Sequence, residues 1–520
     1  MLESGSVKLV ALFRNIEGFR ISGDGLVEVS SLAYHSDEVK SGSLFFCVPG
    51  FVHDGHRFAG AAVEKGAAAL CVERLLDVDV PQVIVSSVAE SMAAAAAAFY
   101  GYPSSKLQVV GITGTNGKTT TAFLTAHMLD CGGRTSGLLG TVERRIGGAS
   151  TPAIRTTSEA VDIQADLSRM LESGDDTAVM EVSSHALALH RVDHVRFAVS
   201  AFTNLTQDHL DFHADLDEYY AAKSRLFMDP VLGADTGWAV VNVGDKYGWE
   251  LAGRLAADRL LTFGVGDATE HSRPDMYLEG LSFDYSGFEG VLVLRGAAAR
   301  LTHRNRTGGS RSGVEVRLAV RSRLVGIFNA ANALAAAGIC LVLGMDPEEI
   351  GLCLADFEGV PGRMERVDVG QPFALLVDYA HTPDSVDNVL RAVRGIGVGK
   401  VITVMGCGGD RDRGKRPMMG KAAEGHSDVL VVTSDNPRSE DPEAIIGDIL
   451  GGLDRPGSAI VEKDRRVAIQ SACGLAEDGD VVMILGKGHE TGQAFADHTI
   501  PFDDRSVAAE ILRDLWGGGA

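Results

Sequence analysis

The segment at residues 111–121, which reads GITGTNGKTTT, constrains the fold of this chain more than any other stretch. An apolar run precedes it at residues 107–110, and a helix-compatible run follows at residues 122–129. A strand, a glycine-rich turn and a helix in this order form a phosphate-binding loop. Glycines let backbone N–H groups converge on phosphate oxygens, and the helix N-terminus adds partial positive charge. The sequence therefore predicts a nucleotide site in an α/β unit.

Two side chains of this loop are expected to act on the nucleotide. Lys118 would reach the terminal phosphates, and the hydroxyl of Thr119 would bind magnesium. The glycine spacing departs from the usual G-x-x-x-x-G-K-[ST], since Gly114 and Gly117 are separated by two residues and Gly111 lies one position too far out. An ordinary strand-to-helix turn is the less favoured interpretation, because glycine, lysine and threonine all coincide here.

The chain has 520 residues, which is too many for one hydrophobic core, so we expect three domains. We place them at residues 1–106, 107–359 and 360–520. Apolar runs alternate with helical stretches throughout, which predicts the α/β class. The expected architecture is a small N-terminal α/β domain, a central P-loop ATPase-like domain with a mostly parallel sheet, and a Rossmann-like C-terminal domain.

Strand-like runs mark the first two domains. We expect strands at residues 43–48, 68–72 and 82–85 in the first domain, and at residues 177–182, 197–202, 238–243 and 260–263 in the second. Residues 281–320 differ, with strand-like pieces around a basic insert at residues 297–313 that is rich in Gly and Arg. A charge run of this kind is usually a solvated loop, which is our expectation, with a functional role as the alternative.

Four apolar runs in the last domain each end at a polar or glycine-rich loop. They span residues 374–377, 401–405, 429–433 and 481–485. In doubly wound sheets, ligands bind beyond the carboxyl ends of the strands. Four charged loops gathered at one edge therefore predict a ligand pocket.

Composition narrows the range of partners. The chain carries 48 basic and 70 acidic residues, a net charge of −22, which argues against a general nucleic-acid binder. The seven cysteines are scattered without a C-x-x-C pair, so reduced thiols in the cytoplasm are expected. Neither a signal peptide nor a membrane span is expected, since the alanine run at residues 93–98 is too short and predicts a buried helix.

Several polar residues follow strands of the central domain and could bind a metal. Glu181 lies at the end of the expected strand at residues 177–182 and would lie across from the phosphate loop, where a carboxylate can hold magnesium. The alternative is that Glu181 has no metal-binding role and is a charged residue at the point where the chain leaves the core. His209 and His213 are close enough in sequence to suggest zinc, but the cysteines or further histidines of a zinc site are missing. A site for a hard metal that combines one or more imidazoles with oxygen ligands fits better.

These motifs together resemble the Mur ligases, the ATP-dependent amide-forming enzymes of peptidoglycan precursor synthesis. The resemblance extends over nearly the whole chain through GTNGKTT, EVSSH, TNLTQDHLD, PGRME, DYAHTPD and GKGHE. It implies three domains and an acyl-phosphate intermediate made with ATP. The stretch from Asp435 to Arg438 resembles the signature of the branch that adds meso-2,6-diaminopimelate as the third peptide residue. This choice is physically sensible, because Arg438 can clamp a carboxylate but would repel the terminal ammonium of lysine.

The resemblance assigns residues to the ATP and metal sites. A first magnesium ion would be held by Thr119 and Glu181, and a second by His209 and a carbamylated Lys223, which without the resemblance would be taken for a surface lysine. Catalysis would rest on Lys118 and these metal-binding residues. The residues implied for ATP are Gly114, Thr115, Asn116, Gly117, Lys118, Thr119, Thr120, Asn329 and Arg363.

The resemblance also implies two further substrates and their contacts. UDP-N-acetylmuramoyl-dipeptide would meet Ser36, Thr156, Thr157, Ser183 and Arg191, with the loop after Gly50 facing uridine. Diaminopimelate would meet Arg411, Asp435, Asn436, Pro437, Arg438, Gly486 and Glu490. The protein would be a cytoplasmic monomer without nucleic-acid or membrane partners.

The chain departs from the family pattern only on the side of the UDP-linked substrate. The departures are His35, Asp37, Arg155, Ser158 and Leu189. Rival interpretations are a lysine-adding ligase or a folylpolyglutamate synthase, against which residues 435–438 argue, and a P-loop motor or switch that hydrolyses ATP without an amino acid.

Overall fold

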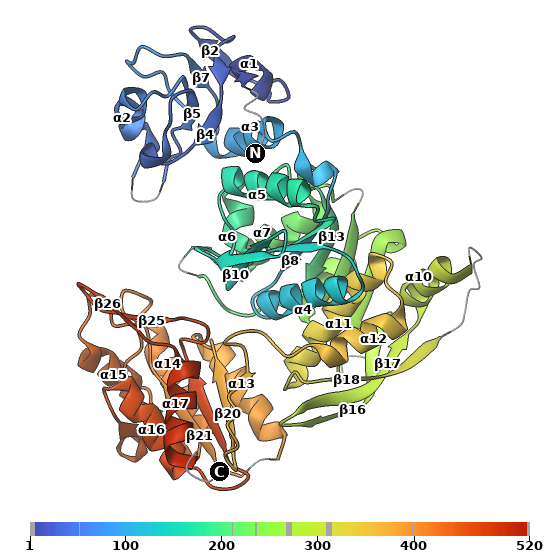
Figure 1. Cartoon of the computed structure of the whole chain (residues 1–520), viewed down its shortest axis with the longest axis vertical. Helices are drawn as coiled ribbons and strands as arrows, with labels where there is room; N and C mark the ends of the chain where they lie inside the picture. Colours follow the sequence, from blue (N-terminus) through green and yellow to red (C-terminus); the bar gives the residue numbers. More distant parts are fainter. Residues whose placement is uncertain are drawn as a thin grey trace.

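The protein is described from a computed structural model at residues 6–50, 53–210, 212–234, 237–266, 273–307, 315–397 and 399–516; for residues 303–307 only the backbone is considered. Three main sheets organise these residues, with five, eleven and six strands in chain order. In Figure 1 the blue N-terminal part and the red C-terminal part lie on different sides of the central sheet. None of the described helices has the length and apolar character needed to cross a membrane.

The N-terminal part is built around a mostly parallel sheet in the order β2-β7-β6-β5-β4. The alanine run lies in a buried helix, α3, as predicted, and Ser87 caps that helix by accepting a hydrogen bond from the Glu90 N–H. The strands are β1 (Val7–Lys8), β2 (Arg20–Ser22), β3 (Glu28–Val29), β4 (Ser31–Ala33), β5 (Ser43–Phe46), β6 (Ala69–Val72) and β7 (Gln82–Ile84). The helices are α1 (Leu9–Leu12), α2 (Ala59–Glu64) and α3 (Val88–Phe99).

The central sheet has a parallel core from β9 to β16 and antiparallel strands at both edges, in the order β11-β10-β9-β12-β8-β13-β14-β15-β16-β17-β18. The strands are β8 (Gln108–Thr113), β9 (Ser136–Leu139), β10 (Glu143–Ile146), β11 (Ala149–Pro152), β12 (Thr177–Glu181), β13 (Phe197–Phe202), β14 (Trp238–Asn242), β15 (Leu260–Gly264), β16 (Met276–Asp284), β17 (Gly287–Leu294) and β18 (Val316–Ser322).

Helices cover both faces of this sheet, as in a doubly wound fold. One hydrophobic cluster joins the sheet to α4 and α11 through residues such as Leu124 and Ala336, and the other joins it to α5 and α7 through residues such as Leu167 and Leu226. The helices are α4 (Lys118–Cys131), α5 (Ala160–Ser173), α6 (Ser184–Ala188), α7 (Leu216–Met228), α8 (Lys246–Ala252), α10 (Gly296–Thr307), α11 (Ile327–Val342) and α12 (Pro347–Asp356).

The prediction of a solvated loop at residues 297–313 is wrong for the first half of this segment. Residues 296–307 form α10, because Ala297 and Ala298 join the main hydrophobic core and Ala299 is buried beside them in sequence. The rest of the insert, from residue 308 onward, lies outside the described residues.

The C-terminal sheet has the order β19-β20-β24-β21-β22-β23, parallel except for β19. All four predicted strands exist here. The strands are β19 (Glu365–Arg366), β20 (Ala374–Asp378), β21 (Val401–Met405), β22 (Val429–Val432), β23 (Ile460–Val461), β24 (Val481–Leu485), β25 (Gly492–Ala494) and β26 (Thr499–Pro501). The helices are α13 (Pro383–Gly395), α14 (Lys415–His426), α15 (Pro442–Leu450), α16 (Arg465–Leu475) and α17 (Asp504–Trp516).

The cysteines correct a second expectation, that all thiols are reduced. Cys131 at the end of α4 and Cys353 in α12 form a disulfide, with a Cα–Cα distance of 6.0 Å. The sequence gives no warning of this bond, because the two residues are separated by 222 positions and meet only after the helices pack. The other five cysteines are buried free thiols.

Candidate active site

The phosphate loop adopts the bend that its glycines permit. Gly114 has a φ of 152° and Gly117 a φ of 89°, in the region that side chains disfavour. A Cβ atom at Gly114 would collide with the Thr203 hydroxyl, and one at Gly117 would collide with the side-chain carbonyl of Asn332. Both positions therefore need glycine for conformation and for space.

Lys118 and Thr119 begin helix α4, directly after this bend. The Lys118 ammonium donates hydrogen bonds to the carbonyl oxygens of Gly114 and Thr115, both at 2.9 Å. Burial lowers the pKa of Lys118, and the nearby Glu181 carboxylate opposes that shift. The Thr119 hydroxyl donates to Oε2 of Glu181 at 2.9 Å. A cation, a hydroxyl and a carboxylate thus meet at the helix N-terminus.

Glu181 lies across from the phosphate loop, where the sequence predicts it. It ends β12, pairs with Ile112 of β8 in parallel register, and is buried. Thr141 holds its carboxylate with the backbone N–H at 2.6 Å and the hydroxyl at 3.1 Å. These donors fix a buried carboxylate in one orientation beside the phosphate loop.

Lys223 of α7 also belongs to this site. Its Nζ donates to the Gly114 carbonyl oxygen at 2.8 Å and lies 4.5 Å from the centre of the Tyr219 ring. Burial lowers the pKa of Lys223 well below its usual value, and the charge of Lys118 lowers it further. A lysine with a depressed pKa presents a neutral amine more readily, which is the form that adds carbon dioxide to become a carbamate.

The two histidines after β13 have different surroundings. The Nε2 atom of His209 lies 3.4 Å from the Asp208 carboxylate. Burial lowers the pKa of His209 to about 4, although Asp208 opposes the shift. His213 is buried instead, with its Nε2 3.0 Å from the Ser184 hydroxyl. Both rings lie against the ring of His185, with centroid distances of 4.8 Å for His209 and 5.8 Å for His213.

The donor set fits magnesium better than zinc. Within the described parts of the chain, no group of three or more His, Cys, Asp or Glu side chains is arranged to hold a metal ion. Zinc needs such a group. Magnesium is commonly held by one or two protein oxygens together with phosphate oxygens and water. The hydroxyl of Thr119 and the carboxylate of Glu181 supply such oxygens.

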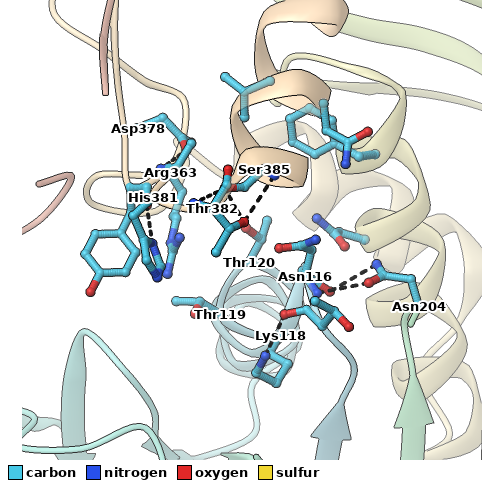
Figure 2. Close-up of a pocket in the computed structure, with 18 of the residues that line it drawn as sticks. Asn116, Lys118, Thr119, Thr120, Asn204, Arg363, Asp378, His381, Thr382 and Ser385 are labelled. Atoms are coloured by element: carbon cyan, nitrogen blue, oxygen red, sulfur yellow. Dashed lines mark hydrogen bonds between the residues drawn. The ribbon is translucent and has the colours of Figure 1, made fainter. Parts of the chain in front are cut away.

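A cavity of about 470 Å³ lies between the phosphate loop and the C-terminal part. Figure 2 shows Lys118, Thr119 and Thr120 on one side of it and Arg363 and His381 on the other. The two residues expected to touch the nucleotide from farther along the chain, Asn329 and Arg363, both line it. The lining includes Thr115, Asn116, Gly117, Lys118, Thr119, Thr120, Thr141, Thr156, Glu181, Asn204, Asp208, His209, Asn329, Asn332, Arg363, Asp378, Tyr379, His381 and Thr382.

The C-terminal wall of the cavity is rigidly built. The Arg363 guanidinium stacks on the Tyr379 ring at 4.6 Å. Asp378 accepts hydrogen bonds from the N–H groups of Met364 and Ala380 at 2.7 and 2.8 Å. Burial raises the pKa of Asp378, while the charge of Arg363 lowers it. A flat cationic surface beside a polar ring suits the base and sugar of a nucleotide.

Four of the residues expected on the UDP-substrate side gather beside Glu181. Thr156 lines the nucleotide cavity. The Thr157 hydroxyl donates to the Ser183 hydroxyl at 3.2 Å, and Arg191 donates to the Thr157 carbonyl oxygen at 3.4 Å. This group is continuous with the phosphate site.

The fifth residue, Ser36, is not brought to this group. It lies in the N-terminal part, where Lys65 donates to its carbonyl oxygen at 3.0 Å. Lys65 also pairs with the exposed departure residue Asp37 at 2.7 Å. Residues 51–52 of the loop expected near uridine lie outside the described residues.

The departure at Arg155 has a visible partner. Both Arg155 and Arg191 pair with Glu159, at 2.7 and 2.9 Å. The structure offers no account of the departures at His35, Ser158 and Leu189.

A second cluster of polar side chains forms where β21, β22 and β24 end. Asn436 donates to the Glu490 carboxylate at 2.6 Å, and Arg438, at a φ of 51°, donates to the Gly409 carbonyl oxygen at 2.6 Å. A Cβ atom at Gly486 would press on the carboxylate of Asp435 at 2.5 Å. The predicted gathering of loops at one sheet edge is therefore present.

The remaining two predicted residues border the same loops. The peptide carbonyl of Pro437 packs so closely on Gly409 that no side chain fits there. Arg411 is exposed and donates to the Asp410 carbonyl oxygen at 3.3 Å.

The sequence reasoning missed several residues of these sites. Lys487 is fully buried and its ammonium donates to the Asn436 side-chain oxygen at 3.0 Å and to the Gly492 carbonyl oxygen at 2.6 Å. Its place in the GKGHE motif could have revealed it. Thr141 stands in no recognisable motif, and only the strand order, which places β9 beside β12, brings it to Glu181.

Comparisons with known proteins identify the class of protein that combines this fold and these sites. Residues 28–100 match the Mur ligase family catalytic domain, residues 112–340 the Mur ligase middle domain, and residues 362–488 the Mur ligase glutamate ligase domain. A relative from Syntrophomonas wolfei is 42% identical and aligned over 98% of this chain and 99% of its own. The chain belongs to the Mur ligase family.

The relatives point to one branch of the family. The relative from Syntrophomonas wolfei is named UDP-N-acetylmuramoyl-L-alanyl-D-glutamate--2,6-diaminopimelate ligase. A solved structure of a protein with the same name has a TM-score of 0.67 and 29% identity, covering 98% of this chain and 99% of its own. A MurF ligase from Thermotoga maritima in complex with ADP has a TM-score of 0.59 and 18% identity, covering 94% of this chain and 96% of its own, and shares the fold.

Proposed function

We propose that this chain is an ATP-dependent ligase that adds meso-2,6-diaminopimelate to UDP-N-acetylmuramoyl-L-alanyl-D-glutamate in peptidoglycan precursor synthesis. The observation that carries this conclusion is the pairing of a phosphate-loop cavity with a cluster of polar side chains at the strand ends of the C-terminal sheet. The names of relatives that align over nearly the whole chain support it. A P-loop motor or switch would not need this polar cluster.

The reaction activates a carboxylate that is otherwise a poor electrophile. An oxygen of the D-glutamate γ-carboxylate attacks the γ-phosphorus of ATP, the bond to the bridging oxygen breaks, and ADP leaves. The diaminopimelate amine then attacks the acyl carbon and forms the amide bond, the acyl–phosphate C–O bond breaks, inorganic phosphate leaves, and the amine proton passes to solvent. Lys118 and the α4 N-terminus offset the charge that builds on the transferred phosphoryl group. Alignment of both partners contributes several kcal/mol.

The ATP and magnesium roles rest on the groups around the phosphate loop. Gly114 to Thr120 would hold the ATP phosphates, and Asn329 and Arg363 its nucleoside. Bound magnesium neutralises phosphate charge. The first ion would use Thr119 and Glu181, and the second His209 and Lys223 as its carbamate. Labelling with ¹³C carbon dioxide tests the carbamate: a carbamate resonance is expected in the wild type and not in Lys223→Arg.

The remaining substrate roles follow the two groups of side chains. Thr156, Thr157, Ser183 and Arg191 would bind the UDP-linked dipeptide near Glu181, and Ser36 would meet its uridine end. Diaminopimelate would bind at the polar cluster of the C-terminal sheet. Its second head group carries a carboxylate that a guanidinium can clamp, which lysine lacks. The residues proposed for it are Arg411, Asp435, Asn436, Pro437, Arg438, Gly486 and Glu490.

The proposed division of labour uses residues 1–106 for the UDP substrate, 107–359 for ATP and 360–520 for the amino acid. A single copy of the chain supplies all residues named for the sites, which supports a monomer. Sedimentation of the protein at working concentration checks this. We place the enzyme in the cytoplasm, where ATP is available, without nucleic-acid or membrane partners.

One experiment separates the candidate functions. ADP and phosphate release are measured with UDP-N-acetylmuramoyl-L-alanyl-D-glutamate, with and without diaminopimelate or lysine. The expected result is rapid release with diaminopimelate and tripeptide as the product. Faster release with lysine would indicate the lysine-adding branch, and release without any amino acid or UDP-linked substrate would indicate an ATPase.

A further inference from the structure

Asp384 carries a contact from the C-terminal part to the phosphate loop. It lies in the first turn of α13, where the helix N-terminus favours a carboxylate. Its Oδ2 atom accepts hydrogen bonds from the Asn116 side-chain amide at 3.0 Å and from the Thr206 hydroxyl at 2.9 Å. Asn116 is separated from Asp384 by 268 positions and lies between the two glycines of the phosphate loop. This contact therefore links two units at the place where the phosphates are proposed to bind.

The central part already fixes the backbone of Asn116. Its N–H donates to the Asn204 side-chain oxygen at 2.9 Å, and its carbonyl oxygen accepts from the Thr203 hydroxyl at 2.6 Å. Only the side-chain amide of Asn116 extends to Asp384. The Thr206 backbone N–H donates to the Thr115 hydroxyl at 3.0 Å, so Thr206 joins the same loop. Asp384 thus orients the side chain of Asn116, while residues of the central part hold the backbone of Asn116.

Lys415 makes a second crossing of the same boundary. Its ammonium lies 3.0 Å from the Asp208 carboxylate. Lys415 begins α14, shortly after Arg411 in the proposed diaminopimelate loop, and Asp208 directly precedes His209. Asp208 is largely buried and Lys415 about one-third exposed. The pair connects the loop for the amine donor with the loop for the nucleotide.

We propose that Asp384 and Lys415 are positioning residues, through which the docked C-terminal part holds the phosphate loop and the 203–209 loop in the arrangement for phosphoryl transfer. The inference rests on the function proposed above. Both residues act on groups that face the nucleotide, Asn116 and Asp208, rather than on a substrate. Their effect should fall on the first step, in which the glutamate carboxylate attacks ATP.

The test uses matched variants of the full-length enzyme. Asp384→Ala is compared with Asp387→Ala, since Asp387 lies on the same helix but binds Arg391 and His426 of its own unit, both at 2.8 Å. Lys415→Met is compared with Lys421→Met, since Lys421 lies on the same helix and pairs with Asp454 of its own unit, at 3.6 Å.

The readout is the single-turnover formation of ADP from ATP, magnesium and the UDP-linked dipeptide, without diaminopimelate. We expect the rate constant to fall at least ~10-fold in Asp384→Ala and in Lys415→Met, the size of effect typical for hydrogen bonds to charged groups. The two control variants should keep the wild-type rate constant. A merely structural loss would lower the amplitude, which reports the folded fraction, and leave the rate constant unchanged.

Conservative variants keep the test decisive if truncation harms folding. Asp384→Asn retains a carbonyl oxygen that can accept both hydrogen bonds and should recover much of the rate constant, as should Lys415→Arg. Thr206→Val removes the hydroxyl that donates to Asp384. Combined with Asp384→Ala, it should lower the rate constant little further. Rate constants in Asp384→Ala and Lys415→Met equal to those of their controls would overturn the proposal. Wild-type enzyme that forms no ADP with the UDP-linked dipeptide would refute the proposed function instead.

Discussion

At the scale of single residues, each of the two proposed sites contains a positively charged side chain, and the two side chains are held by different hydrogen bonds. Lys118 is half-buried and donates hydrogen bonds to carbonyl oxygens of its own loop. Arg438 is held at a φ of 51° with one N–H on the Gly409 carbonyl oxygen. In the proposed roles, Lys118 would meet phosphate, and the remaining guanidinium donors of Arg438 would meet a ligand carboxylate.

Lys118→Ala should abolish ligation. The substitution removes the cation that offsets charge on the transferred phosphoryl group, and we expect kcat to fall at least ~1000-fold. Steady-state ADP release measures it, with a thermal melt to show that the variant is folded. Turnover close to the wild type would count heavily against the assigned site.

Arg438→Ala should impair the use of diaminopimelate far more than the binding of ATP. Loss of a charged hydrogen-bonding partner costs about 2–5 kcal/mol, so kcat/KM for diaminopimelate should fall at least ~30-fold while the ATP dissociation constant stays the same. Arg413→Ala is the control, because Arg413 lies on the same rim but is 71% exposed and pairs with Glu440. Equal losses for both substrates would remove the proposed role.

The sequence predicted these residues better than it predicted their surroundings. Lys118 and Glu181 could be placed because a glycine turn and a strand end are local signals. Thr141, Lys487 and the Asp384 contact could not, because each meets its partner only after strands or units far apart in sequence pack together. The resemblance, and not residue chemistry, identified Lys223, since a lone lysine carries no local signal of burial.

At the scale of elements, a buried ion pair contacts the segments that lead into the proposed amino-acid site. Arg465 of α16 binds Asp504 of α17 at 2.7 and 2.8 Å, and both side chains are inaccessible. Arg465 also donates to the carbonyl oxygens of Ser434 and Leu485, which lead into the two pocket loops. The guanidinium of Arg465 therefore links helices α16 and α17 to the loops of the proposed amino-acid site.

Asp504→Ala should destabilise the protein by about 3–5 kcal/mol, because it leaves a buried arginine without its partner. Glu510→Ala removes an exposed pair between the same two helices, Arg466 with Glu510 at 2.8 Å, and should cost less than ~1 kcal/mol. Urea unfolding of both variants measures the difference. Similar costs in the two variants would contradict the buried arrangement.

The disulfide between α4 and α12 should stabilise the central part. Closing a long loop typically contributes about 2–5 kcal/mol. Reduction should therefore lower the Tm, and Cys131→Ser should show the lower Tm with or without reductant. Thiol titration of the denatured protein should give five thiols before reduction and seven after it. Seven thiols in both samples, or one unchanged Tm, would refute this prediction.

The sequence located strands more accurately than it described long insertions. The strands β13, β21 and β24 begin and end where their apolar runs predicted, because fully buried parallel strands are continuous apolar runs. Helix α10 was missed, because its charged residues favoured a loop and the burial of its alanines depends on the main core.

At the scale of the whole molecule, helix α5 forms part of the contact between the N-terminal part and the central part. Helix α3 packs against α5, and the Tyr34 hydroxyl donates to the Asp162 carboxylate of α5 at 2.6 Å. Burial and this hydrogen bond raise the pKa of Tyr34. Tyr34 lies two positions before Ser36, so this contact orients the segment proposed to meet uridine.

Tyr34→Phe should raise the KM for the UDP-linked substrate up to ~10-fold, because it removes a hydrogen bond that holds the N-terminal part against α5. It should leave kcat and the KM for ATP nearly unchanged. Tyr102→Phe is the control, since its hydroxyl accepts a hydrogen bond from Asn15 at 3.2 Å within the N-terminal part. A rise in the KM for ATP of the same size would show that the contact acts on the whole enzyme.

The nucleotide cavity takes its walls from two separate sheets, and this has a consequence for inhibitors. A compound that spans from the glycines of the phosphate loop to the Tyr379 ring acts as a cross-link between the two units. Its escape requires the units to part, so its residence time should report how often that parting occurs.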